Sequence, residues 1–112
     1  MRNIELVVEI ENNFEKQRYN CNGVENKDII RAKNDLVEFI YDRKIVKLMK
    51  KEKKNTVSID FSNKNIDIID RENTVSFKIN VSKYFVSDNI LRATYNIDDN
   101  IFQIFIEIKY LD

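Results

Sequence analysis

The chain of 112 residues contains no histidine, no proline and no tryptophan, and it has only one glycine and one cysteine. Histidine is the commonest general base, nucleophile activator and metal ligand, so its absence excludes Ser-His and Cys-His catalysts and leaves a zinc site without its usual donors. Carboxylates are plentiful, but most fall at turn tips or on outward faces, where they are solvated. We therefore expect a protein that is not an enzyme and that holds no metal and no cofactor.

The scarcity of glycine and cysteine narrows the function further. With Gly23 alone there is no Gly-rich loop to cradle a phosphate, which excludes a P-loop or a Rossmann turn. Asparagine should then supply most turns, because it tolerates the left-handed backbone region. Cys21 cannot form an internal disulfide, and no charged start precedes an apolar stretch of signal length. We expect a cytoplasmic protein.

Charge is balanced, since 19 basic residues face 19 acidic ones. No global field recruits nucleic acid or an anionic membrane, and no apolar run approaches the roughly 18 to 20 residues that span a bilayer. The one concentrated charge is "KIVKLMKKEKKN", residues 44 to 55, which we interpret as a solvated strand and hairpin that lacks stacking aromatics. The expected partners therefore include no nucleic acid and no membrane.

Apolar and polar residues alternate in many short segments separated by Asn, Asp and Lys clusters. Alternation with period two is typical of half-buried strands. The clearest segments are "IELVVEIE", "LVEFIY", "TVSIDF", "NIDII", "TVSFKINV" and the closing "ILRATYNIDDNIFQIFIEIKYL". Turn clusters every 8 to 12 residues or so predict an all-β protein, an antiparallel sandwich or barrel that forms a single domain over residues 1–112.

Residues 28 to 50 are open to a second interpretation. Ile29, Ala32, Leu36 and Ile40 also fit a helical stripe, and no proline or glycine interrupts it. The alternative is an α+β fold with one helix around residues 28 to 50 packed on an antiparallel sheet. The β-branched and aromatic residues of "LVEFIY" and the turn cluster "KND" favour strands.

The order of these segments resembles the DUF1934 group, small bacterial proteins of unknown function with a calycin-like, lipocalin-type barrel. The matching features are the opening "IELVVEIE", Gly23 in "NGV" before "IIRAKNDLVEFIYD", the pair Tyr41-Asp42, and the last hairpin. Arg71 also matches, but Asn73 stands where the family has a glycine. The resemblance implies an up-and-down barrel of the calycin type and implies no activity.

A barrel interior of this kind could hold a ligand. Several tyrosine hydroxyls converging in an apolar interior are what a small-ligand pocket needs. We predict a ligand-binding face made of Tyr41, Tyr95, Phe102, Ile104 and Tyr110, with Tyr95 and Tyr110 near each other across the last hairpin. On this hypothesis the protein is a non-catalytic binder of a small apolar or amphipathic ligand.

The alternative function is a protein interaction or oligomerisation module with a filled core. Val7, Ile101 and Phe105 fall on faces that are otherwise polar. Outward apolar residues that cluster across neighbouring strands mark a partner surface, and here they would indicate a homodimer. A void inside the barrel would favour a ligand, whereas a filled interior with an apolar outer patch would favour a partner.

Overall fold

The computed structural model describes residues 1–111, and every regular element within them is a β-strand. No helix in this range is long and apolar enough to cross a membrane. The strands are β1 (Arg2–Glu11), β2 (Lys16–Asn26), β3 (Ile29–Lys33), β4 (Glu38–Asp42), β5 (Lys47–Lys51), β6 (Thr56–Asp60), β7 (Asn65–Asp70), β8 (Asn73–Lys78), β9 (Asn80–Val86), β10 (Ile90–Ile97) and β11 (Asn100–Tyr110).

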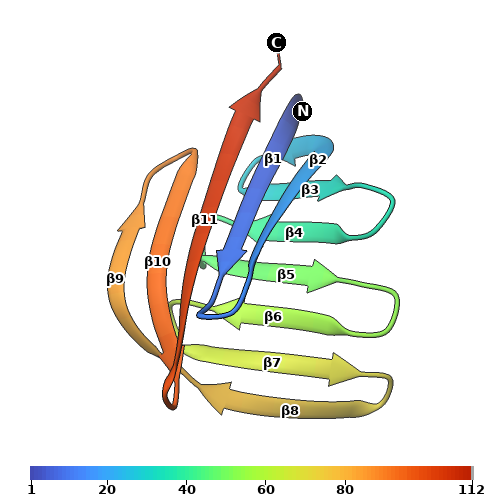
Figure 1. The fold of residues 1–112 in the computed structure, drawn as a ribbon. Helices are drawn as coiled ribbons and strands as arrows, with labels where there is room; N and C mark the ends of the chain where they lie inside the picture. Colours follow the sequence, from blue (N-terminus) through green and yellow to red (C-terminus); the bar gives the residue numbers. More distant parts are fainter. Residues whose placement is uncertain (112) are drawn as a thin grey trace.

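All neighbouring strands are antiparallel and belong to one nearly closed sheet with the order β8-β7-β6-β5-β4-β3-β2-β1-β11-β10-β9. Pairing of β1 with β11 joins the first and last strands in the middle of the sheet, and the sheet stays open between its two edges, β8 and β9 (Figure 1). The predicted antiparallel up-and-down barrel is confirmed. The helix considered for residues 28 to 50 is wrong, because these residues form β3, β4 and most of β5.

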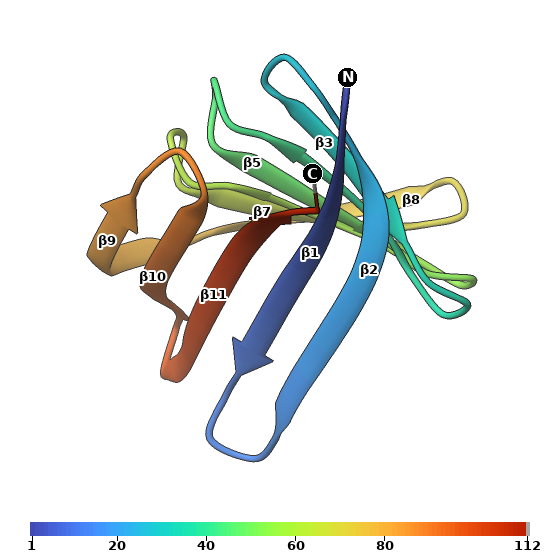
Figure 2. The same cartoon turned by 90° about the horizontal axis from the view of Figure 1, so that it is seen from above.

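The rolled sheet forms two crossed layers. Figure 2 shows the arc of β9, β10, β11, β1 and β2 in front of β3 to β8, whose strands run across it. Inward side chains of both layers meet in one hydrophobic core, to which β1 contributes Ile4, Leu6 and Val8, and the other layer contributes Ile30, Phe39 and Leu48. Burial of each such side chain contributes about 1.5 to 3 kcal/mol. Because successive side chains of a strand point to opposite faces, segments with apolar residues at every second position bury their apolar side chains best as strands.

The turns use asparagine differently from the prediction. The side-chain oxygens of Asn12 and Asn34 accept hydrogen bonds from backbone N–H groups two and three residues later, which stabilises these turns. The left-handed positions, however, are occupied by other residues: Lys27, Val46, Lys64, Arg71 and Asp98. A left-handed valine is strained, and the packing of the Val46 side chain against the core offsets this strain.

Three hairpins of the second layer repeat at an interval of 18 residues. Their first residue pairs are Ile29 with Asp42, Lys47 with Asp60, and Asn65 with Lys78. Successive turns are joined by backbone hydrogen bonds at the same interval, from the N–H of Arg43, Phe61 and Ile79 to the carbonyls of Asp28, Val46 and Lys64, at 2.9, 3.1 and 3.0 Å. The sequence "NTVS" recurs at residues 55–58 and 73–76. The second layer is therefore an array of equivalent units, the arrangement found in repeat proteins.

Candidate functional site

Four of the five predicted ligand-binding residues belong to the core. Tyr41, Tyr95 and Ile104 are buried, and Phe102 packs against them from the rim. Tyr95 lies directly opposite Phe102, and their rings stack with centroids 5.3 Å apart. These four side chains belong to, or pack against, one hydrophobic core.

Tyr110 lies elsewhere, and the expected proximity of Tyr95 and Tyr110 is wrong. β10 begins at Ile90, which pairs with Glu107, so the end of β11 extends beyond the last hairpin. Tyr110 pairs instead with Ile4 of β1, eight residues along the strand from Phe102. The five predicted residues therefore do not line one site.

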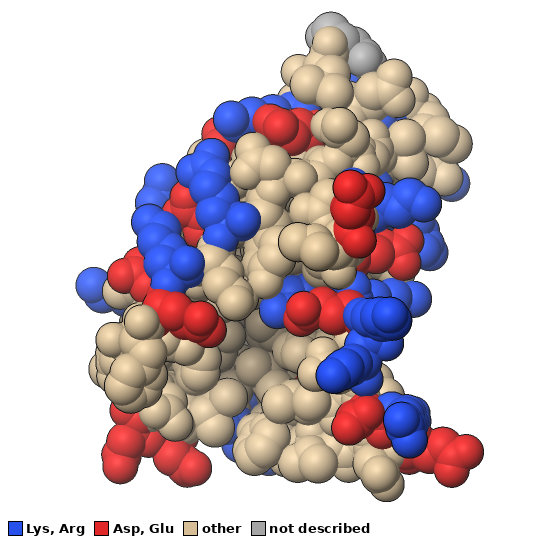
Figure 3. All heavy atoms as spheres, turned by 45° about the vertical axis from the view of Figure 1, so that its right-hand side comes forward, with Lys and Arg blue, Asp and Glu red and all other residues tan. Residues whose placement is uncertain are grey.

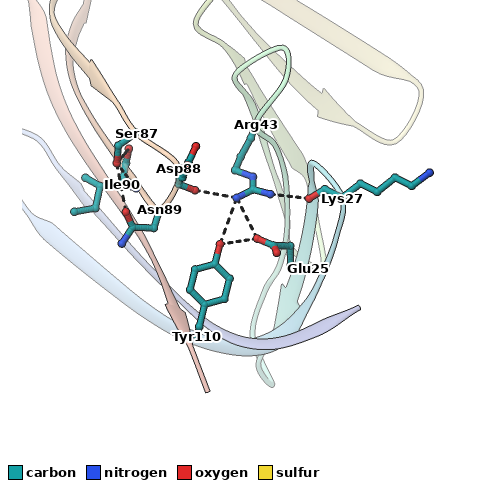
Figure 4. Close-up of polar contacts among 8 residues, drawn as sticks. All are labelled: Glu25, Lys27, Arg43, Ser87, Asp88, Asn89, Ile90 and Tyr110. Atoms are coloured by element: carbon teal, nitrogen blue, oxygen red, sulfur yellow. Dashed lines mark hydrogen bonds and ion pairs between the residues drawn. The ribbon is translucent and has the colours of Figure 1, made fainter. Parts of the chain in front are cut away.

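Tyr110 belongs to a polar cluster that also contains Glu25 and Arg43 (Figure 4). The Tyr110 hydroxyl donates to Glu25 Oε2 at 2.7 Å, and Arg43 Nη1 lies 3.0 Å from the same oxygen. Arg43 also donates to the carbonyls of Asp88 and Lys27, at 2.9 and 2.6 Å. The hydrogen bond to Glu25 is the main cause that raises the pKa of Tyr110, followed by burial and the Glu25 charge.

This cluster ties four separate parts of the barrel together: β2, the turn after β4, the turn after β9, and β11. The Asp88 carbonyl is positioned by its own turn, in which the Ile90 N–H donates to Ser87 Oγ at 3.2 Å. A hollow of about 500 Å³ lies beside the cluster and is lined by Asp28, Arg43, Val86, Ser87, Asp88 and Tyr110. Because Arg43 pairs with the Glu25 carboxylate and also donates to two backbone carbonyls, the cluster stabilises the fold.

A larger groove, about 680 Å³ in volume, lies on the outer face of β1, β11, β10 and β9. It carries charges of both signs that are partly engaged with each other: Arg18 Nη1 lies 2.6 Å from Glu9 Oε1, and the Arg92 guanidinium lies 4.6 Å from the centroid of Phe105. Figure 3 shows another face, on which acidic and basic side chains are interspersed along both margins with uncharged side chains between them. Neither face carries an extended patch of one sign.

The Tyr41 hydroxyl is a buried group without a hydrogen-bond partner among residues 1–111. Burial, reinforced by nearby Tyr84 and opposed by Arg43, raises the pKa of Tyr41 to about 12. A buried donor of this kind is unusual and costs stability, so Tyr41 is the residue of the predicted set that most needs an explanation.

The outward apolar residues predicted to mark a partner surface behave differently from one another. Val7 is fully buried, so its inclusion was wrong, while Ile101 is exposed and Phe105 is partly buried. Lys50, in the run interpreted as solvated, is partly covered, since it pairs with Glu52 at 3.0 Å and lies 5.5 Å from the Tyr19 ring.

Strand β8 is an uncovered apolar feature that sequence reasoning missed, and β9 is another, with Tyr84, Phe85 and Val86 exposed. All six residues of β8 are exposed, and its principal contact is with β7. Val75 and Phe77 face the same side as Val57 and Ile59, 18 residues earlier, yet they are 52% and 37% exposed whereas Ile59 is buried. The recurrence of "NTVS" was the signal that could have shown that a third equivalent hairpin ends the array.

β9, the other edge, also exposes six of its seven residues, but its pairing edge is less regular than that of β8. Its register with β10 shifts between Thr94 and Tyr95, and such a bulge twists an edge away from pairing. Tyr84 of β9 also packs against Phe61, with ring centroids 6.3 Å apart. β8 has no such bulge, because all six of its residues pair with β7 in unbroken register.

No protein-family model, curated protein or solved structure matches the chain. The function is therefore inferred from the features of its own structure.

Proposed function

We propose that the protein is a non-catalytic interaction module that accepts a β-strand of a partner along the open edge of β8. The observation that carries this proposal is that β8 ends a repeating array without the neighbour that each earlier strand of the array has. The buried, unpaired Cys21 supports the cytoplasm as the compartment in which the module works.

The backbone of β8 is prepared for pairing. Arg71 and Glu72 form a two-residue turn, and Asp70 and Asn73 close it. In such a hairpin the closing residues exchange hydrogen bonds, so alternate residues point their backbone groups toward β7 or away from it. Thr74, Ser76 and Lys78 therefore direct their N–H and C=O groups to the free edge, which is the template for strand addition.

The side chains show what kind of strand would fit. In the preceding hairpin, Val57 and Ile59 lie opposite Ile68 and Ile66 of β7. Val75 and Phe77 occupy the equivalent positions and lack such a cover. A strand with apolar residues at alternate positions would bury them, which contributes about 1 kcal/mol for each because they start 52% and 37% exposed and are already partly covered.

The test uses a peptide whose register the array itself specifies. A fluorescein-labelled peptide covering residues 64–71 contains β7, which already covers β6 in the equivalent position. We expect it to bind the protein, measured by fluorescence polarisation. The Ser76→Pro variant should bind it at least about tenfold more weakly, because proline removes an edge N–H that pairs with the peptide.

Ser76→Ala is the matched control. Both variants lose the hydroxyl that donates to Asp67 Oδ1 at 2.6 Å, but only proline loses the backbone donor. Ser76→Ala should therefore bind the peptide about as well as the unchanged protein. Absence of peptide binding, or equal binding by the proline variant, would refute strand addition at β8.

The second candidate is the binding of a small apolar or amphipathic ligand inside the barrel. The single observation that favours it is the Tyr41 hydroxyl, which is buried and has no hydrogen-bond partner among the described residues. Uptake of an apolar dye that Tyr41→Phe abolishes, with peptide binding unchanged, would support this candidate over the first.

A further inference from the structure

We propose that the strand taken up by β8 is the β8 strand of a second copy of this chain, so that the module forms a two-fold symmetric dimer. This inference rests on the proposed strand addition and names its partner. It follows from the sequence of β8, "NTVSFK", which is complementary to itself in one antiparallel register.

In that register Ser76 lies on the two-fold axis, opposite Ser76 of the other copy. Val75 then lies opposite Phe77 and Thr74 opposite Lys78, in both directions. The two apolar residues of each copy meet on the core side of the sheet, and the polar residues meet on the outer side. The sheet continues from one barrel into the other with its faces unchanged.

Other registers are less complete. A shift by one residue places Val75 opposite Ser76, which joins the core side of one copy to the outer side of the other. An axis on Val75 leaves Phe77 opposite Asn73 and pairs only two edge residues of each copy. An axis on Phe77 requires Ile79 to lie opposite Val75 of the other copy. Ile79 is buried, and its N–H already donates to the Lys64 carbonyl at 3.0 Å. The Ser76 axis alone pairs all three edge residues, Thr74, Ser76 and Lys78.

Charge also favours this register. Lys78 lies opposite Thr74 and diagonally from Glu72 of the other copy, because Glu72 continues the same outward row into the turn. No like charges are directly opposed, and each copy contributes one such Lys-Glu pair. These contacts are exposed, so they select the register more than they add affinity.

Because six residues per copy form the contact, the buried area falls below the roughly 1,200 Å² of stable interfaces. We therefore expect a reversible dimer with a dissociation constant in the micromolar range or above, visible by sedimentation velocity only when the concentration is varied. Ser76→Pro should shift the protein to monomer at every concentration, and Ser76→Ala should leave the dimer intact.

Cysteine cross-linking tests the register directly. Thr74 and Lys78 would face each other as a hydrogen-bonded pair with Cα atoms about 5.5 Å apart, within the range of a disulfide. Thr74 and Thr74 of the two copies would be about 15 Å apart, because they are offset by four residues along the strands as well as across the pair, and this is beyond the range. Thr74→Cys and Lys78→Cys proteins, mixed and mildly oxidised, should form a disulfide-linked heterodimer, and neither should do so alone. Cys21 is 1% exposed and serves as an internal blank.

The outcomes separate this inference from the proposal on which it rests. A protein that stays monomeric up to about 1 mM, or that cross-links equally through Thr74→Cys alone, overturns the β8–β8 dimer. If the residue 64–71 peptide still binds and Ser76→Pro still abolishes that binding, strand addition stands and the partner is a different strand. Loss of both results overturns both.

Discussion

Replacing Tyr41 by phenylalanine should make the protein more stable. The Tyr41 side chain is 2% exposed, and its hydroxyl has no hydrogen-bond partner within the part of the chain that the structure describes. Burying a donor without a partner costs about 1 to 3 kcal/mol, whereas removing one oxygen from a packed site sacrifices only a few dispersion contacts. We expect the free energy of unfolding to rise by about 1 kcal/mol in Tyr41→Phe.

The pH dependence of stability provides an independent measure of the same group. An unfolded tyrosine ionises near the ordinary pKa of 10.0, whereas burial raises the pKa of Tyr41 in the folded protein to about 12. The folded state therefore holds the proton longer, and its stability falls as the pH rises from about 10 to about 12. Two pKa units correspond to about 3 kcal/mol, so the advantage of Tyr41→Phe should grow across this interval.

Urea unfolding followed by far-ultraviolet circular dichroism suits this measurement, because the chain has no tryptophan. The unchanged protein and Tyr41→Phe are compared at pH 7 and at steps between pH 10 and pH 12. A loss of stability at pH 7 would refute the reasoning, since it would mean that the hydroxyl has a favourable partner. A constant difference between the two proteins above pH 10 would refute the assigned pKa.

Two further predictions concern other positions. Tyr110→Phe should lower the free energy of unfolding by about 1 to 2 kcal/mol in urea titrations, because it removes the 2.7 Å hydrogen bond to the Glu25 carboxylate; unchanged stability would contradict the stabilising role of the polar cluster. Gly23→Ala should cost at least about 3 kcal/mol in thermal unfolding, because the new Cβ would collide with the Arg31 carbonyl and with Ala32 of the neighbouring strand. The exposed neighbour Asn22→Ala is its control, and equal effects of both changes would contradict the assigned collision.

Alternation in the sequence predicted the strands, but it could not predict what covers them. Val75, Phe77, Ile79 and Val81 were read as one strand with one inward face. In the structure the chain bends at Ile79, which passes from one layer to the other, and this run divides between β8 and β9. The inward face was predicted, yet Val75 and Phe77 remain exposed because no strand lies beyond β8.

The site was harder to predict than the fold, since alternation does not fix how two strands are aligned. Tyr95 was expected near Tyr110, but it pairs with Phe102, and Tyr110 lies past the end of β10. The Glu25, Arg43 and Tyr110 cluster joins side chains 18, 67 and 85 residues apart, and no local pattern brings these together. Membership of the DUF1934 group stays a prediction.

The length of the crossing layer limits the number of hairpins that the array can hold. β9 begins beside Ile79, passes Phe61 at Tyr84, and ends at the turn whose Asp88 carbonyl meets Arg43. Its seven residues span about 20 Å, and two hairpins stacked between Arg43 and Ile79 span about 19 Å, because adjacent strands lie about 4.8 Å apart. A fourth hairpin would extend past the end of the crossing layer, and its inward side chains would have no facing layer to pack against. The array therefore ends where the crossing layer ends, and its last strand, β8, keeps a free edge.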